Sequence, residues 1–91
     1  MNNKIAIESL SMDLLRVSLG YHRGSVKMAQ RFSREAQKRC SEIQKIELKP
    51  YFVRVLEKIQ SVLSKPGEER TAEDTLMYSI LCKNYAKKFL N

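Results

Sequence analysis

The fold is decided by residues 9–45, whose sequence is SLSMDLLRVSLGYHRGSVKMAQRFSREAQKRCSEIQK. Apolar side chains recur there in steps of three and four, the spacing of one face of an α-helix. They are Leu10, Leu14, Val17, Tyr21, Met28, Phe32, Ala36, Cys40 and Ile43. The steps keep their phase across Gly20 and Gly24, although each glycine costs about 1 kcal/mol in a helix interior. We therefore predict one long basic helix from Ser9 to Lys45, with a kink near the glycines.

A second interpretation of this stretch is two helices joined by a short turn at Gly20–Ser25. Glycine suits tight turns, and serine is a residue type that caps the start of a helix, so Ser25 would begin the second one. A broken helix also opens a further option, a helix-turn-helix protein that recognises DNA sequence. Sequence preference in a competition assay would test that option.

Proline, glycine and charge mark the remaining helices. Pro50 suits the first position of a helix, where its missing N–H has no helical partner, so we predict a middle helix over Pro50–Ser64. Residues 64–67 (Ser-Lys-Pro-Gly) are the clearest loop signal in the chain. Residues 71–74 (Thr-Ala-Glu-Asp) resemble a capping box and predict a last helix over Ala72–Leu90.

The last predicted helix is apolar over most of its circumference, at Leu76, Met77, Tyr78, Ile80, Leu81, Cys82, Tyr85 and Phe89. Such a helix normally lies between neighbours, so we predict a central position for it. The chain has no β-hairpin signal and no period-two alternation. With 91 residues, it is expected to form a single domain over 1–91. The predicted fold is an all-α bundle of three helices, or of four if the chain breaks at the glycines.

The composition excludes most enzymes and metal sites. The single histidine and three glycines leave no metal-binding motif and no glycine-rich phosphate loop, and no Ser-His-Asp or Cys-His set is present. We therefore expect no catalysis, no metal, no cofactor and no small-molecule substrate.

Cys40 and Cys82 lie far apart in the sequence and indicate buried thiols of a cytoplasmic protein. No apolar stretch approaches the roughly 20 residues of a membrane span.

The positive charge of the chain is concentrated. Seventeen Lys and Arg against ten Asp and Glu give a net charge of +7. On one continuous helix, seven cations would share an arc of about 80° and a length of about 44 Å. They are Arg16, Arg23, Lys27, Arg31, Arg34, Lys38 and Lys45. Only two acids, Glu35 and Glu42, lie between the first and the last of them.

Like charges one helical turn apart destabilise a helix, whereas a nucleic-acid backbone would stabilise them through the release of counterions. These seven residues are therefore predicted to bind the backbone of RNA or single-stranded DNA without sequence preference. Arg54, Lys58 and Lys65, on one face of the middle helix, are predicted secondary contacts. The alternative is an ordinary solvated helix face.

The most basic part of this stretch is Arg23-Gly-Ser-Val-Lys27-Met-Ala-Gln-Arg31-Phe-Ser-Arg34-Glu-Ala-Gln-Lys38-Arg39. In a short, all-helical, basic chain, it resembles the small subunit of Cascade-type CRISPR effector complexes, which serve antiviral defence. The resemblance covers the general character of most of the chain and no diagnostic motif. It implies a non-catalytic protein, present in several copies beside other subunits along a guide RNA. Its basic face would hold the target or displaced strand through the backbone.

A second function also fits the sequence. The chain could be a protein–protein adaptor or a homo-oligomeric bundle whose basic residues meet an acidic partner. Four apolar residues outside the main apolar arcs would then form its interface. They are Leu15, Leu19, Val26 and Val53.

Overall fold

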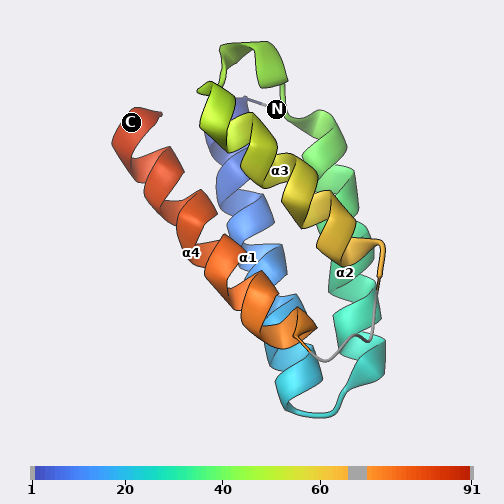
Figure 1. The fold of residues 1–91 in the computed structure, drawn as a ribbon. Helices are drawn as coiled ribbons and strands as arrows, with labels where there is room; N and C mark the ends of the chain where they lie inside the picture. The colour runs from blue at the N-terminus through green and yellow to red at the C-terminus, as the bar shows by residue number, and fades with distance from the viewer. Residues whose placement is uncertain (1, 66–69, 91) are drawn as a thin grey trace.

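The structure is a computed structural model that describes residues 2–65 and 70–90. It contains α1 (Asn3–His22), α2 (Val26–Glu42), a short 3-10 turn η1 (Lys45–Glu47), α3 (Pro50–Leu63) and α4 (Thr71–Phe89). Successive helices run in opposite directions along a bundle whose Cα extents are 36 × 19 × 19 Å (Figure 1). The described residues contain no strand, which confirms the predicted all-α class, and their four α-helices correspond to the alternative in which the chain breaks at the glycines.

The prediction of one long helix from Ser9 to Lys45 is wrong, and the alternative with a turn is correct. Gly24 has φ +73°, a left-handed conformation that favours glycine. The N–H of Ser25 donates to the carbonyl of Gly20 (2.8 Å), and the N–H of Gly24 donates to the carbonyl of Tyr21 (3.2 Å). These two bonds form a Schellman motif, which ends α1. The hydroxyl of Ser25 then accepts from the N–H of Met28 (3.3 Å) and caps α2.

The other glycine of the hairpin has a different role. Gly20 lies inside α1 and is buried against α2, and a Cβ there would lie 2.7 Å from the backbone nitrogen of Ala29. The missing side chain therefore lets α1 and α2 approach closely. The link between the two helices is only three residues long, close to one helical turn. For that reason the apolar steps keep their phase in the sequence although the chain reverses direction.

Helix α2 ends at Glu42, three residues before the predicted end, because the next segment bonds to α1. The side-chain amide of Asn3 donates to the carbonyl of Gln44 (3.0 Å), and its oxygen accepts from the N–H of Gln44 (2.9 Å). A second anchor follows at Lys49, whose N–H donates to the hydroxyl of Tyr85 on α4 (2.9 Å). The segment from α2 to α3 is thus attached to both α1 and α4.

The predicted bounds of the last two helices are confirmed to within one residue. Pro50 is the first residue of α3, as expected, and acids in the first turn and lysines in the last turn of α4 match its dipole. The predicted capping box is wrong, since Thr71 lies inside α4 and no side chain caps that end. Of the predicted loop, Pro66 and Gly67 lie outside the described residues.

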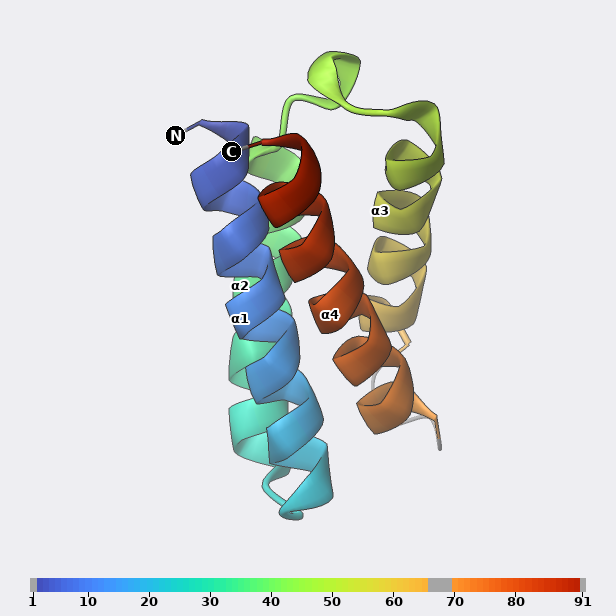
Figure 2. The ribbon, with the colours of Figure 1, turned by 90° about the vertical axis from the view of Figure 1, so that its left-hand side faces the viewer.

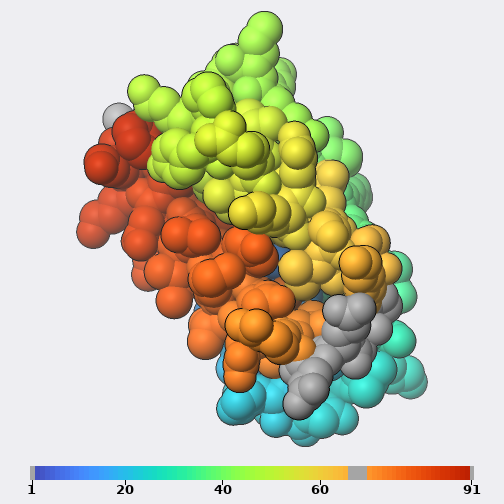
Figure 3. Space-filling model, in the orientation of Figure 1, coloured from blue at the N-terminus to red at the C-terminus, as the bar shows by residue number. Residues whose placement is uncertain are grey.

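Helix α1, and not α4, is the central helix of the bundle. It packs extensively against both α2 and α4, whereas α3 makes much smaller contacts with the same two helices. Three of its side chains, Ile7, Leu10 and Leu14, are completely buried. Figure 2 shows α4 in front, between α1 and α3, with an open outer side. In the space-filling view α3 and α4 make the front face and cover most of α1 (Figure 3).

Small polar side chains join α4 to α1. The hydroxyl of Ser11 donates to the carbonyl of Ser79 (2.7 Å), and the hydroxyl of Ser79 donates to the carbonyl of Ser11 (2.7 Å). Farther along, the hydroxyl of Ser18 donates to the carbonyl of Ala72 (2.7 Å). Short side chains at these positions keep the two helices close, and the hydroxyl groups are satisfied by the neighbouring backbone.

The two cysteines are buried, as the sequence predicts, and neither forms a disulfide. Burial raises the pKa of the Cys40 thiol to about 11 and raises the pKa of Cys82 as well. Both thiols are therefore protonated near neutral pH, which makes them poor nucleophiles.

No helix within residues 2–65 and 70–90 combines the length and the apolar character needed to cross a membrane.

Candidate nucleic-acid interface

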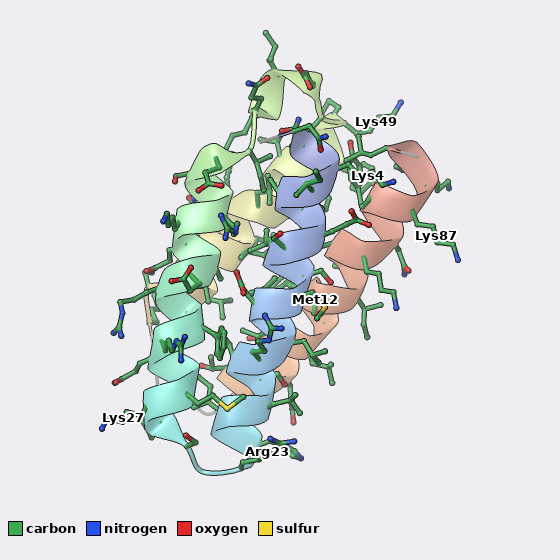
Figure 4. The ribbon with its side chains drawn as sticks, turned by 180° about the vertical axis from the view of Figure 1, so that it is seen from behind. Lys4, Met12, Arg23, Lys27, Lys49 and Lys87 are labelled. Carbon is green, nitrogen blue, oxygen red and sulfur yellow. The ribbon has the colours of Figure 1, made fainter. Side chains whose placement is uncertain are left out.

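Helix α2 carries four exposed cations on its outer face, opposite the side chains that it buries. We name them the α2 row: Lys27, Arg31, Arg34 and Lys38. Steps of four, three and four residues place them within an arc of about 60° and along about 17 Å of helix. Figure 4 shows Lys27 at the start of α2, with its side chain directed away from the bundle. The row is the part of the predicted cationic stripe that the structure retains.

The α2 row has no carboxylate partner among the residues that the structure describes, where the ion pairs join other residues. Its members therefore repel one another across each turn of the helix. An anion that lies along the row would remove this repulsion and gain direct attraction. A guanidinium group can also donate two parallel hydrogen bonds to one phosphate, so Arg31 and Arg34 suit a phosphate backbone.

An aromatic ring brings Arg16 of α1 next to the row. The guanidinium carbon of Arg16 lies 5.2 Å from the centre of the Phe32 ring, and that of Arg31 lies 5.4 Å from the same centre. Arg16 is also 3.6 Å from a carboxylate oxygen of Asp13, and its side chain is 43% exposed. Arg16 thus adds a cation to the α1 side of the row, although this cation is partly neutralised.

A mostly buried carboxyl group lies behind this cation. Burial raises the pKa of Asp13 above its ordinary value of 3.8; Arg39 and Arg16 oppose this shift, and Glu35 adds to it. Arg39 in turn pairs with Glu42 at 3.0 Å. Its buried Nε has no hydrogen-bond partner within the described part of the chain. Arg39 is thus partly buried and paired with Glu42, so it adds less positive charge to the surface than the members of the α2 row.

The structure separates the other predicted contacts from the α2 row. Arg23 caps the end of α1, and Figure 4 shows it at the same end of the bundle as Lys27 but on the other helix. Lys45 lies in η1, beyond the end of α2. Arg54 and Lys58 are exposed on α3, on the side opposite its buried residues. The continuous stripe of about 44 Å does not exist, because it required the unbroken helix.

A second group of cations was missed by the sequence analysis. The ammonium groups of Lys49 and Lys88 each lie 5.3 Å from the centre of the Phe89 ring. Figure 4 shows Lys4 and Lys49 at the end of the bundle opposite Arg23. These lysines come from three separate segments, so no helical spacing could have grouped them. The only signal in the sequence is the pair Lys87 and Lys88 before Phe89, and these charges also match the dipole of α4.

Comparisons with protein-family models, with curated proteins and with solved structures find no match to this chain. Among the described residues, no group of three or more His, Cys, Asp or Glu side chains could hold a metal ion. The functional inference is based on the α2 row, because four cations without a carboxylate partner in residues 2–65 and 70–90 define the chemistry of a ligand.

Proposed function

We propose that this chain is a non-catalytic subunit that binds the backbone of RNA or single-stranded DNA through the α2 row. The observation that carries the proposal is the set of four exposed cations on one face of α2, without carboxylate partners in the described structure. Arg16 extends the contact towards α1 through its position over Phe32. The bound group is the phosphate, because point charges and guanidinium forks match phosphates.

The proposed binding is independent of base sequence. Contacts to phosphates fix the position of a strand but carry no sequence information. The row is about 17 Å long and carries four cations, so it can neutralise about four phosphates of a strand. A site of this length binds a strand weakly by itself, and its affinity rises when several such sites contact the same strand.

The resemblance to the small subunit of Cascade-type CRISPR complexes supplies the proposed setting. In such an assembly several copies would stand side by side, and the α2 rows of neighbouring copies would follow one strand. Multivalent contact of this kind raises affinity without any new type of contact. Base pairing to a guide would then supply the specificity that the row lacks.

The test compares two pairs of charge reversals that change the net charge equally. Arg31→Glu with Arg34→Glu alters the α2 row, and Arg54→Glu with Lys58→Glu alters the exposed side of α3. Fluorescence anisotropy with a labelled single-stranded RNA at low salt gives the dissociation constants, and circular dichroism verifies that the variants fold. Two lost phosphate contacts, replaced by repulsion, should weaken binding at least tenfold in the first variant, at about 1.4 kcal/mol per factor of ten.

The α3 variant should lose much less affinity, because its cations are predicted only as secondary contacts. Equal losses in the two variants would show that net charge, and not the row, controls binding. Unchanged affinity in the Arg31→Glu, Arg34→Glu variant would overturn the proposal.

A further inference from the structure

The outer face of α4 exposes a group of large apolar side chains. Helix α4 buries one large side chain, Tyr85, and otherwise short ones against the bundle: Thr71, Thr75, Ser79, Cys82 and Ala86. It exposes long apolar ones: Leu76, Met77, Ile80 and Leu81, between 41% and 51% accessible. An ordinary surface helix has the opposite arrangement, with its large apolar side chains directed into the core. This inversion indicates that another surface covers the outer face.

The apolar surface continues onto α1. Met12 is 49% exposed. A shallow groove of about 320 Å³ between the two helices is lined by Met12, Leu15 and Lys83, among others. In Figure 4, Met12 lies on the side of α1 that faces α4. By contrast, of the four apolar residues predicted as a protein interface, only Val26 is exposed, and Leu15, Leu19 and Val53 are half-buried.

Two of the charges on this face, Glu73 and Lys87, are placed symmetrically about Ile80. Glu73 and Lys87 lie seven residues before and after Ile80, which is two helical turns, so the three share one side of α4. Met77 and Asn84 fill the intervening positions, in the alternating steps of four and three that form the seam of a coiled coil. Glu73 and Lys87 thus lie at opposite ends of a side of α4 whose centre is Met77 and Ile80.

We propose that the outer face of α4 binds the same face of a second copy, with the two α4 helices antiparallel. A twofold axis at Ile80 would place Glu73 of each chain opposite Lys87 of the other, and the helix dipoles would also be opposed. A parallel pair would instead bring Glu73 to Glu73 and Lys87 to Lys87. The charge pattern therefore selects a self-complementary partner in one orientation, and this pairing does not depend on nucleic-acid binding.

Sedimentation velocity over a concentration series, after nuclease treatment and removal of nucleic acid, measures the proposed dimer. Its interface is narrow, so we expect a reversible monomer–dimer equilibrium. Ile80→Glu places two carboxylates at the axis and should abolish the dimer. Ile46→Glu, a matched change at a residue that is 94% exposed in η1, should leave it unchanged.

Charge reversal tests the orientation. Glu73→Lys and Lys87→Glu should each shift the equilibrium towards monomer, and the double variant should restore the dimer because each pair is re-formed with exchanged signs. A protein that is monomeric at all concentrations overturns the proposal, as does a dimer unaffected by Ile80→Glu. If this face of α4 binds only a different protein, the proposed dimer is also overturned. The result does not depend on the nucleic-acid measurements.

Discussion

Gly20 and Ala29 bring the backbones of α1 and α2 into direct contact. The position that a Cβ of Gly20 would occupy is 2.7 Å from the backbone nitrogen and 2.9 Å from the Cα of Ala29. Two helices whose backbones are in contact cannot easily slide or rotate against each other. This contact fixes α2, and with it Arg31 and Phe32, relative to Arg16 on α1.

Replacement of Gly20 by alanine should destabilise the protein. Helix propensity alone would stabilise α1 by about 1 kcal/mol. The added methyl group, however, meets backbone atoms of α2, which cannot move aside as a flexible side chain can, and such overpacking costs about 1–3 kcal/mol. Urea unfolding followed by circular dichroism gives the free energy of unfolding. A gain in stability would contradict the close contact.

Gly24 should respond to substitution for a different reason. Its φ of +73° is left-handed, and no atom lies within 4 Å of a Cβ placed there. Gly24→Ala should therefore cost about 1–2 kcal/mol through backbone strain alone. Gly24→Asn should cost less, because asparagine tolerates this conformation at a helix end. Equal losses for the two variants, measured by the same unfolding method, would exclude the Schellman turn.

Much of the fold could be predicted because its signals are local. Pro50 begins α3, and the charge order of α4 matches its direction, so both helices were placed to within one residue. The turn after α1 was misjudged because three residues of connection preserve the apolar phase. The central role of α1 could not be predicted either, since nothing in the sequence shows that α4 buries Ser79 and exposes Ile80.

The candidate site was predictable only within one helix. The four cations of the α2 row share a face by helical spacing alone, and that part of the prediction needed no tertiary information. Arg23 and Lys45 were included because the helix was taken as continuous. The position of Arg16 over Phe32, and of Lys49 near Phe89, depends on how the helices pack.

Asp13 should give the protein a distinct pH dependence. Because burial raises its folded pKa above 3.8, the ionised carboxylate opposes folding at neutral pH. This cost is lost as the pH falls through the raised pKa towards 3.8. Relative to Asp13→Asn, which has no charge to titrate, the wild-type protein should therefore gain stability as the pH falls from 7 through the raised pKa of Asp13. A constant difference in unfolding free energy would contradict the buried position of the carboxyl.

The two thiols should be unreactive in the folded protein. Cys40 and Cys82 are 1% and 0% exposed, and burial raises the pKa of Cys40 to about 11. A thiol reagent with a chromogenic leaving group should therefore react slowly at pH 8 and rapidly with both residues in denaturant. Fast labelling of either cysteine without denaturant would contradict the described burial of both thiols in the core.

The α2 row predicts how nucleic-acid binding depends on salt. Each neutralised phosphate of a single strand contributes about −0.7 to the slope of log K against log salt concentration. The four cations of the row should therefore give a slope of about −3. Replacement of two of them by neutral residues should reduce it to about −1.5, with binding weakened for all sequences alike.

The most direct measurement is this slope in the wild-type protein and in the Lys27→Gln, Lys38→Gln variant, with Arg54→Gln, Lys58→Gln as the control of equal charge. We predict that the slope is halved in the α2 variant and changes little in the α3 control. An α2 variant that keeps the wild-type slope, or a wild-type protein that does not bind single-stranded RNA at low salt, would contradict the proposal that the α2 row binds phosphates.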